Sequence, residues 1–203
     1  MTKRRDARTV HVLLPDPFAD WEPSLLLCEL ARLGGWTVVT VGIDGREIRS
    51  MGGLRVTTDT VIAEVDPAGV STAVVIGSPR WEQAPIPAVS AFLRAAAQGG
   101  ALVAAICGGT LAAGHAGLLQ ERRYTSNDPD FVAKLVGAAR VGTYVDAAAV
   151  RDGQVITAGG LGYVELAAEV LVAIGAMPAA AKDGWVGFLR TPPGAATGAG
   201  AAA

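Results

Sequence analysis

Short apolar runs alternate with longer amphipathic segments along most of the chain. Most of the runs consist of branched aliphatic residues, a pattern typical of strands that are buried on both faces. We expect strands at Val10–Leu14, Trp36–Val41, Thr72–Ile76, Ala101–Ile106, Val141–Val145 and Gln154–Thr157. We expect helices at about 20–33, Pro87–Gln98, Gly108–His115, from Pro129 onward, and at Leu161–Ile174. This alternation predicts an α/β domain with a mostly parallel sheet covered by helices on both faces.

Glycine and aspartate residues mark where several of these elements begin and end. Asp20 is a candidate cap for the first helix, which ends at two consecutive glycines, 34–35. Two more glycines, 52–53, interrupt a strand-like stretch at 47–58 and predict a small hairpin there. The pair at 152–153, Asp-Gly, predicts a second hairpin turn.

The length and composition fit one globular domain. The chain has 203 residues, which is close to the usual size of a single domain. We place this domain at 9–190, between a flexible start at 1–8 and a low-complexity tail at 191–203. Hydrophobic residues make up 51% and charged residues only 18%, which excludes disorder for the body of the chain. The net charge of −2 argues against a broad basic face for nucleic acid.

The apolar segments are too short for a membrane protein. Mean hydropathy is positive, at +0.37, but the longest candidate run, 101–107, has seven residues. A membrane-spanning helix needs about 20. The basic first residues are followed by only a short apolar stretch, unlike a secretory signal. We therefore expect a cytoplasmic protein that binds neither membrane nor nucleic acid.

The residues just past the predicted strands are the candidates for chemistry. In an open parallel sheet, ligands bind at the carboxyl ends of the strands. The polar, aromatic and glycine residues beyond these ends are expected to converge on one crevice. They are Asp20, Trp21 and Glu22 after the first strand, Gly77 and Ser78 after the third, Cys107 after the fourth, and Asn127 and Asp128 after a polar turn. Trp81 is a further candidate wall of the crevice, although tryptophan is commonly a core residue.

Cys107 is the strongest candidate among them. It stands between a buried strand and a helix that begins with two glycines, Gly108 and Gly109. Such a sharp turn is a nucleophile elbow, which lifts the side chain into the crevice. The helix start directs N–H groups at the sulfur, which favours the thiolate and can hold a developing oxyanion. The alternative, a cysteine that merely ends a buried strand, is disfavoured by this context.

The other candidate residues have structural explanations that compete with the functional ones. Glu22 fits a first-turn acid favoured by the helix dipole, but also a carboxyl that exchanges a proton with the thiol. His11 is expected to be a packed core residue, and His115 lies about 12 Å along its helix, too far to act on Cys107. Cys28 is expected to be buried on a helix face. Two cysteines are too few for a disulfide framework or a cysteine zinc cage.

At these residues the sequence resembles the ThiJ/PfpI superfamily, which has the class I glutamine amidotransferase-like fold. The stretch 18–22, Phe-Ala-Asp-Trp-Glu, is similar to the family's first-helix motif with its buried glutamate. The stretch 105–110, Ala-Ile-Cys-Gly-Gly-Thr, is similar to its cysteine elbow, and residues 116–119 and 122–127 resemble the family's segment after that elbow. The similarity spans about residues 10–190. It implies a flavodoxin-like three-layer α/β/α domain, commonly a homodimer, with Cys107 as nucleophile beside Glu22.

The resemblance also implies an oxyanion site. The departures from the family pattern disfavour some of the activities found in the family. Ser78 stands where the family usually has glycine or alanine, and its N–H would hold an oxyanion together with that of Gly108. Family members that cleave amides pair the cysteine with a histidine. Here Gly108 follows the cysteine, and no histidine follows His115. Asn127 stands where the deglycase and glyoxalase branch often has a histidine.

Two functions of different classes remain open from the sequence. The first is a thiol-dependent enzyme on a small carbonyl compound, in which Cys107 attacks, Glu22 moves the proton, and the amides of Ser78 and Gly108 hold the oxygen. The second is a stress-response or redox-sensing protein whose Cys107 oxidises to a sulfinate held by Glu22. A glutaminase or a peptidase is disfavoured because no histidine is suitably placed. We expect a small-molecule substrate, no cofactor and no metal, because the spacing of histidines, cysteines and acids suits no ligand set.

Overall fold

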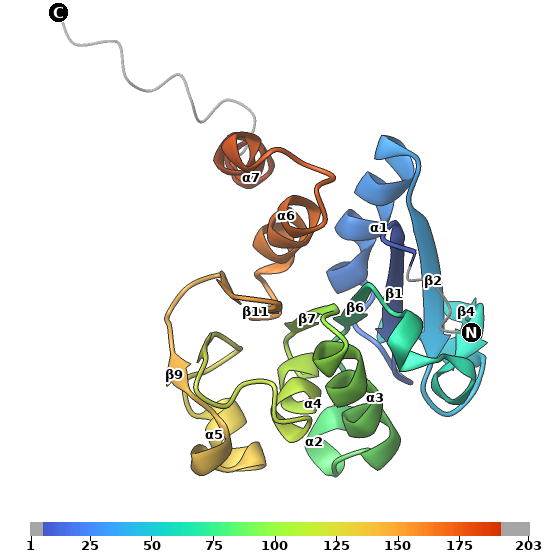
Figure 1. Ribbon diagram of the computed structural model, residues 1–203, viewed down its shortest axis with the longest axis vertical. Coiled ribbons are helices and arrows are strands. Elements are labelled where there is room, and N and C mark those ends of the chain that lie inside the picture. Colours follow the sequence, from blue (N-terminus) through green and yellow to red (C-terminus); the bar gives the residue numbers. More distant parts are fainter. Residues whose placement is uncertain (1–5, 192–203) are drawn as a thin grey trace, which may run out of the picture.

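A single seven-stranded sheet forms the centre of the protein, and the computed structural model describes residues 6–191 (Figure 1). The strand order is β10-β11-β7-β6-β1-β2-β5, and every neighbouring pair is parallel except β10 with β11. The bounds are β1 Thr9–Leu14, β2 Thr37–Gly42, β5 Thr60–Val61, β6 Thr72–Val75, β7 Leu102–Ile106, β10 Ala149–Asp152 and β11 Val155–Ala158. The predicted mostly parallel sheet is therefore confirmed.

Helices cover both faces of this sheet. One face carries α1 Trp21–Leu33, α6 Tyr163–Ala173 and α7 Lys182–Arg190; the other carries α2 Arg80–Gln83, α3 Pro87–Gln98, α4 Gly109–His115 and α5 Phe131–Val136 (Figure 1). Single 3₁₀ turns occur at Ile62–Glu64, Pro67–Gly69, Ala138–Arg140 and Ala179–Ala181. This arrangement is the three-layer, flavodoxin-like α/β/α fold that the resemblance implies.

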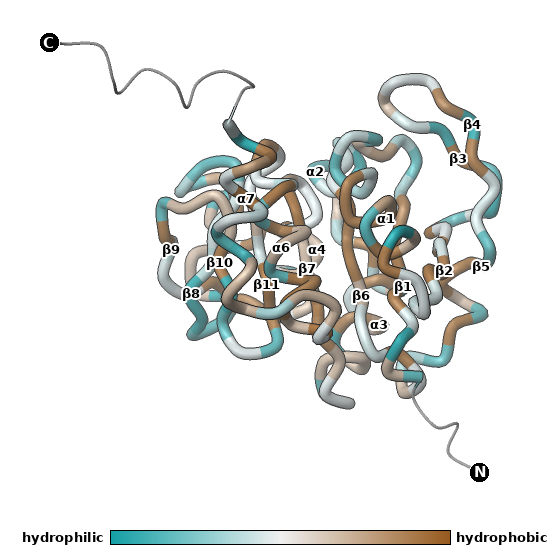
Figure 2. Tube along the Cα trace, turned by 90° about the horizontal axis from the view of Figure 1, so that it is seen from above, coloured by the Kyte–Doolittle hydropathy of each residue, from teal (hydrophilic) through white to brown (hydrophobic). Residues whose placement is uncertain are grey.

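Two apolar cores hold the three layers together. Because side chains alternate along a strand, Val12 of β1 packs toward α1 and α6, while Leu13 packs toward α3 and α4. Leu26 and Leu30 belong to the first core. The hydropathy colouring shows hydrophobic stretches along the central strands β1, β6 and β7 (Figure 2). Within residues 6–191, no helix is long and apolar enough to cross a membrane.

Two small sheets lie outside the central one. The predicted hairpin is confirmed as β3 Glu47–Arg49 and β4 Arg55–Thr57, which pair antiparallel. The strand expected at 141–145 is shorter, β9 Thr143–Tyr144, and it pairs with β8 Arg123–Tyr124 instead of joining the main sheet. The second predicted hairpin turn is confirmed between β10 and β11.

The structure corrects two local predictions on α1. Asp20 does not cap the helix with its side chain, because its backbone is already helical. Its carboxylate instead accepts hydrogen bonds from Ser50 Oγ at 2.6 Å and Gly52 N at 3.0 Å, which ties the β3–β4 hairpin to the helix start. Cys28 is exposed and not buried, because the face turned to the sheet is the one that carries Leu26 and Leu30.

The chain ends of the described region also differ in part from expectation. The C-terminal helix α7 is absent from the sequence prediction, because its glycines at 184 and 187 weaken the helical pattern. The expected flexible start and low-complexity tail lie mostly outside the described residues. Asp6 O accepts a hydrogen bond from Ser71 Oγ, and Arg8 O accepts one from Thr37 N, so the first described residues are joined to the sheet.

Candidate active site

The elbow at Cys107 has the backbone geometry that its sequence context predicts. Cys107 is one of two residues other than glycine with positive φ in the described chain, at +56°. A side chain in this left-handed region costs roughly 1–3 kcal/mol and persists only where neighbours enforce it. Ala158 O accepts the Cys107 N–H at 2.9 Å, and Thr110 Oγ1 donates to Cys107 O at 2.6 Å. These bonds hold the strained turn between β7 and α4 and leave the thiol partly exposed.

The Glu22 carboxyl lies beside the Cys107 thiol, inside the protein. Glu22 is in the first turn of α1 and only 1% exposed, and its Oε2 accepts the Gly77 N–H at 2.6 Å. Oε1 is buried without a hydrogen bond of normal geometry. Burial raises the pKa of Glu22 more than its hydrogen bonds with Gly77 and Cys107 lower it. Glu22 is therefore a buried carboxyl and not the surface acid that a helix dipole favours.

Each group of this pair changes the proton affinity of the other. Burial raises the pKa of Glu22 to about 7, against the opposing effects of the Gly77 N–H and of Cys107. Burial, and next the charge of ionised Glu22, raise the pKa of the Cys107 thiol, while N–H groups of Asn127 and Gly108 oppose that rise. The Gly108 N–H at the helix start favours the thiolate, as expected, but burial and the nearby carboxylate outweigh it. Near neutral pH the two groups can therefore exchange a proton.

Two backbones approach each other closely where an oxyanion would be held. A Cβ atom on Gly108 would lie 2.7 Å from Ser78 O and 3.3 Å from Ser78 N, so only glycine fits. Among the hydrogen bonds of residues 6–191, neither the Ser78 N–H nor the Gly108 N–H donates to another backbone group. The Ser78 hydroxyl is occupied, because it accepts the Arg80 N–H at 3.0 Å. The Ser78 and Gly108 backbones therefore lie close together, and within the described residues neither N–H is taken by a backbone acceptor.

Asn127 is the third side chain at the sulfur. Its Nδ2 donates to Cys107 Sγ at 3.2 Å, and its Oδ1 accepts the Gly160 N–H at 2.9 Å. Gly160 follows β11, and its carbonyl accepts a hydrogen bond from the indole Nε1 of Trp21 at 3.1 Å. Sequence reasoning missed Gly160, which directly precedes the helix expected at Leu161–Ile174. The order of the strands, in which β11 lies beside β7, brings this glycine to the cysteine.

A crevice of about 700 Å³ opens beside this group. Trp21, Asn127 and Gly160, all of which take part in the hydrogen bonds near the sulfur, belong to its lining. The remaining lining residues come from four parts of the chain: Ser126, Tyr144, Asp146, Ala147, Ala148, Gly159, Leu161, Gly162, Glu165 and Arg190. Cys107 itself is not among the lining residues, but Asn127 and Gly160 lie between the crevice and its sulfur. The volume suits a small molecule.

Four residues predicted to line the crevice, Gly77, Asp20, Trp81 and Asp128, are not among its lining residues. Gly77 donates its N–H to the buried Glu22 carboxyl. Asp20 binds the hairpin instead, through Ser50 and Gly52. Trp81 is 4% exposed and packs in the core, with its Nε1 donating to Ile76 O at 2.8 Å. Asp128 is exposed, and its carboxylate accepts the Asp130 N–H just before α5. Asp20 and Asp128 form hydrogen bonds with nearby loops and Trp81 packs in the core, although each is close in sequence to a residue of the site.

Both histidines of the chain lie elsewhere. His115 lines a small hollow beside Trp81 and α3, and His11 lines another with Asp6 and Thr9. Within residues 6–191, no three histidine, cysteine, aspartate or glutamate side chains gather in a way that could hold a metal ion. Glu22 is the titratable side chain whose effect on the pKa of Cys107 is resolved.

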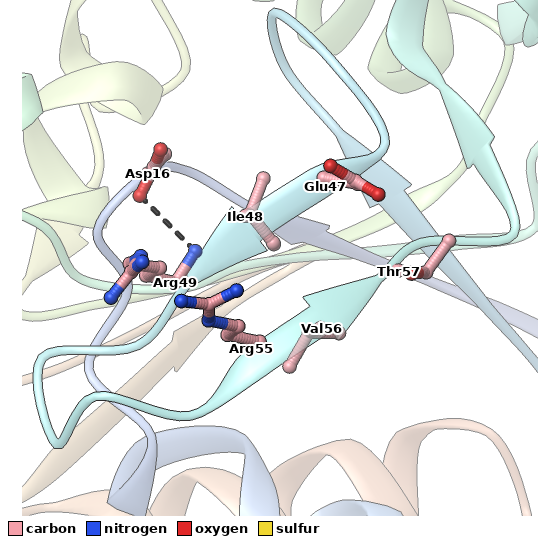
Figure 3. Close-up of a pocket in the computed structure, with 7 residues that line it drawn as sticks. All are labelled: Asp16, Glu47, Ile48, Arg49, Arg55, Val56 and Thr57. Carbon is pink, nitrogen blue, oxygen red and sulfur yellow. Dashed lines mark hydrogen bonds between the residues drawn. The ribbon is translucent and has the colours of Figure 1, made fainter.

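A separate hollow of about 280 Å³ lies on the β3–β4 hairpin (Figure 3). The guanidinium groups of Arg49 and Arg55 lie side by side there, because the two residues are direct cross-strand partners. Asp16 Oδ1 accepts the Arg49 N–H at 3.2 Å. This hollow shares no lining residue with the crevice beside Cys107.

Gly77 provides a first test of the site geometry. A Cβ atom at this position would lie 2.6 and 2.7 Å from the Glu22 carboxyl oxygens and 2.8 Å from Cys107 Cβ. We expect Gly77→Ala to displace the carboxyl and to lower the free energy of unfolding by about 1–3 kcal/mol, as overpacked cores do. Urea denaturation measures the change. Gly45→Ala, at a glycine with open space around it, is the matched control, and equal stability of the two variants would contradict the packing described.

Comparisons with known proteins agree with this fold. The family model described as the DJ-1/PfpI family matches residues 8–173. The chain is 29% identical over 172 residues to the uncharacterized protease YoaZ of Bacillus subtilis, covering 81% of this chain and 82% of that protein. It is similar to the crystal structure of the DJ-1 superfamily protein Atu0886 from Agrobacterium tumefaciens, with a TM-score of 0.80, 31% identity, and coverage of 89% and 96%.

A second solved structure gives the same result. The thiJ/pfpI family protein from Bacillus anthracis superposes with a TM-score of 0.82 at 27% identity and covers 93% of each chain. The matched region contains the elbow, the buried carboxyl and the loop of Asn127. The chain therefore belongs to the DJ-1/PfpI family.

Proposed function

We propose that the protein is a cysteine-dependent enzyme that acts on small carbonyl compounds of the 2-oxoaldehyde type, with Cys107 as the nucleophile. One observation carries the proposal: a carboxyl that is 1% exposed, with a pKa raised to about 7, lies beside a partly exposed thiol on a strained turn. Such a carboxyl can accept the thiol proton and return it at neutral pH.

The first step forms a carbon–sulfur bond. The thiol proton of Cys107 passes to Glu22 as the sulfur attacks the aldehyde carbon, and the carbonyl electron pair moves onto oxygen. The N–H groups of Ser78 and Gly108 hold that oxygen until it takes the proton back from Glu22. The product is a hemithioacetal, and atoms and charge balance without a co-reactant.

The second step moves a hydrogen within the bound substrate. The aldehyde-derived carbon loses a proton and its neighbouring carbonyl carbon gains one, while the hydroxyl proton on the first carbon's oxygen moves to the oxygen of the second. These shifts convert the hemithioacetal into a thioester of a 2-hydroxy acid. Glu22 is the group placed to carry the proton between the two carbons. Water then hydrolyses the thioester, releasing the hydroxy acid and the Cys107 thiol. The net reaction adds one water and needs no external oxidant.

Analysis of the products formed by purified protein tests this function. Purified protein is incubated with glyoxal or methylglyoxal, and the formation of glycolate or lactate is followed by an enzyme-independent separation such as ion chromatography. We expect product to form in proportion to protein concentration. Product formation no faster than in buffer with an equal amount of albumin would contradict the proposal.

A redox-sensing role is the second candidate, and one observation favours it. The sulfur accepts a hydrogen bond from Asn127 and lies beside a carboxyl with a raised pKa, so a sulfinate formed there would find two donors, Asn127 and protonated Glu22. Two equivalents of hydrogen peroxide oxidise the thiol to the sulfinic acid and release two waters.

The exposed Cys28 makes this alternative testable within one molecule. We expect graded peroxide to convert Cys107 to the sulfinate before Cys28, although Cys28 is the more exposed thiol. Mass spectrometry of the digested protein gives the extent of oxidation at each site. Oxidation that follows exposure, with Cys28 first, would exclude a specialised sensor at Cys107.

Amide hydrolysis receives less support, although two relatives are named uncharacterized proteases. A cysteine peptidase needs a base such as histidine to activate the thiol and to protonate the leaving amine. Both histidines of this chain line hollows that do not include Cys107. We therefore place carbonyl chemistry ahead of proteolysis.

A further inference from the structure

A chain of three hydrogen bonds connects the crevice surface with the Cys107 sulfur. The indole Nε1 of Trp21 donates to Gly160 O at 3.1 Å, the Gly160 N–H donates to Asn127 Oδ1 at 2.9 Å, and Asn127 Nδ2 donates to Sγ at 3.2 Å. The four residues come from the start of α1, the segment after β11, the segment before α5, and the elbow. These segments meet only in the folded protein.

The orientation of the Asn127 carboxamide follows from this chain. An amide side chain presents either its oxygen or its NH₂ group to a neighbour, and the hydrogen bonds around it decide which. Because the Gly160 N–H occupies Oδ1, the NH₂ group is directed at the sulfur. A donor in that place stabilises the thiolate, whereas the carbonyl oxygen in the same place would destabilise it.

Gly160 has no side chain, which permits its close approach to Asn127 and the sulfur, and its flexible backbone needs another contact to fix it. A Cβ atom there would lie 3.2 Å from Sγ and 3.5 Å from Asn127 Oδ1, closer to the sulfur than the packing comfortably allows. A glycine is also the residue with the most backbone freedom. The Trp21 side chain is 41% exposed, so burial alone does not account for its position, and its one polar atom is bound to the Gly160 carbonyl.

We propose that Trp21 is a positioning residue for the thiol: by fixing Gly160 it keeps the Asn127 NH₂ group directed at Cys107, and so raises the thiolate fraction. The inference deepens the proposed function, because the thiolate is the attacking group there. It concerns the reactivity of the sulfur alone, and it holds whether or not a carbonyl compound is the substrate.

The charged group that affects the Cys107 thiol does not stabilise the thiolate. Of the residues whose effect on the thiol is resolved, Glu22 on α1 is the one that titrates, and its charge opposes the thiolate. The elbow and the segment before α5 contribute neutral N–H donors, from Gly108 and Asn127. The carboxamide is the one side-chain donor among them, so its orientation is the variable that Trp21 controls.

The test measures the rate of Cys107 alkylation by iodoacetamide as a function of pH, in a Cys28→Ser background so that one thiol reacts. Asn127→Leu is expected to raise the midpoint by about one pH unit, which is roughly tenfold slower alkylation at neutral pH. Trp21→Phe keeps the aromatic ring and removes the N–H. It is expected to slow alkylation about threefold in the same direction.

The double variant decides whether Trp21 acts through Asn127. If it does, Trp21→Phe has no further effect once Asn127→Leu is present, because the relay is already broken. Trp36→Phe, at the opposite end of the sheet before β2, is the matched control and is expected to leave the midpoint unchanged. An unchanged midpoint in Trp21→Phe, or an equal shift with and without Asn127, would overturn the proposal. Product formation from glyoxal plays no part in this readout, so a failure of the proposed function remains distinguishable.

Discussion

Replacing Cys107 with serine or alanine is expected to lower turnover of glyoxal-type substrates by about a thousandfold or more. Alanine removes the nucleophile, and serine offers a hydroxyl that a carboxyl with a pKa of about 7 does not deprotonate effectively. The measurement is the initial rate of hydroxy acid formation with each purified variant.

Cys28→Ser provides the matched control for this loss. Cys28 is the other cysteine of the chain, it is exposed on α1, and it has no place in the site. We expect its replacement to leave the rate unchanged. Equal rates in the wild type and both Cys107 variants would show that any turnover occurs away from this sulfur.

Replacing Glu22 with glutamine is expected to change the pH dependence of stability by about 3 kcal/mol. Burial raises the pKa of Glu22 from 4.5 to about 7 in the folded protein. A carboxyl with a raised folded pKa contributes stability while it is protonated in both states, below about pH 4.5. That contribution is lost as pH rises toward 7, because the unfolded chain ionises first. Glutamine does not titrate, so Glu22→Gln keeps the stability that the wild type loses.

Urea unfolding of both proteins between about pH 4 and pH 8 measures this difference. The variant is expected to gain stability relative to the wild type as pH increases, with most of the gain between about pH 4.5 and 7. Glu169→Gln, which removes a carboxylate from a half-buried ion pair with Lys182 outside the site, is the control. A constant difference between Glu22→Gln and the wild type at every pH would contradict a buried carboxyl with a raised pKa.

The parts of the site that depend on local sequence can be predicted. A buried strand followed by Cys107 and two glycines specifies a sharp turn, and the structure has it, with φ at +56°. Glu22 is identifiable from its motif near the start of the first helix, and its carboxyl does face the thiol. Gly77 and Gly108 are expected near the cysteine because each follows a central parallel strand, and both backbones approach it closely.

The parts that depend on strand order cannot be predicted in this way. Gly160 lies at the sulfur because β11 pairs with β7, a pairing that no local pattern specifies. The carboxamide of Asn127 acquires its orientation only through that glycine. The pKa of the thiol cannot be predicted from the helix after the elbow, because the desolvation of Cys107 and Glu22 depends on the groups packed around them.

The exposed and buried faces of α1 show a similar limit. The leucines predict its apolar stripe, but Cys28, expected on that stripe, projects from another side of the helix. An aspartate before a helix is commonly a cap, which is why Asp20 is interpreted as one from the sequence. The hairpin that it actually binds, through Ser50 and Gly52, is distant in the sequence.

The proposed reaction requires the Cys107 sulfur to form a covalent bond with an aldehyde carbon. Nuclear magnetic resonance of methylglyoxal labelled with ¹³C at the aldehyde carbon follows that carbon directly, in protein carrying Cys28→Ser. We predict a transient hemithioacetal resonance followed by the carboxylate resonance of lactate, and the loss of both when Cys107 is also replaced by alanine. Formation of labelled lactate at the same rate without Cys107 would contradict covalent catalysis by this residue.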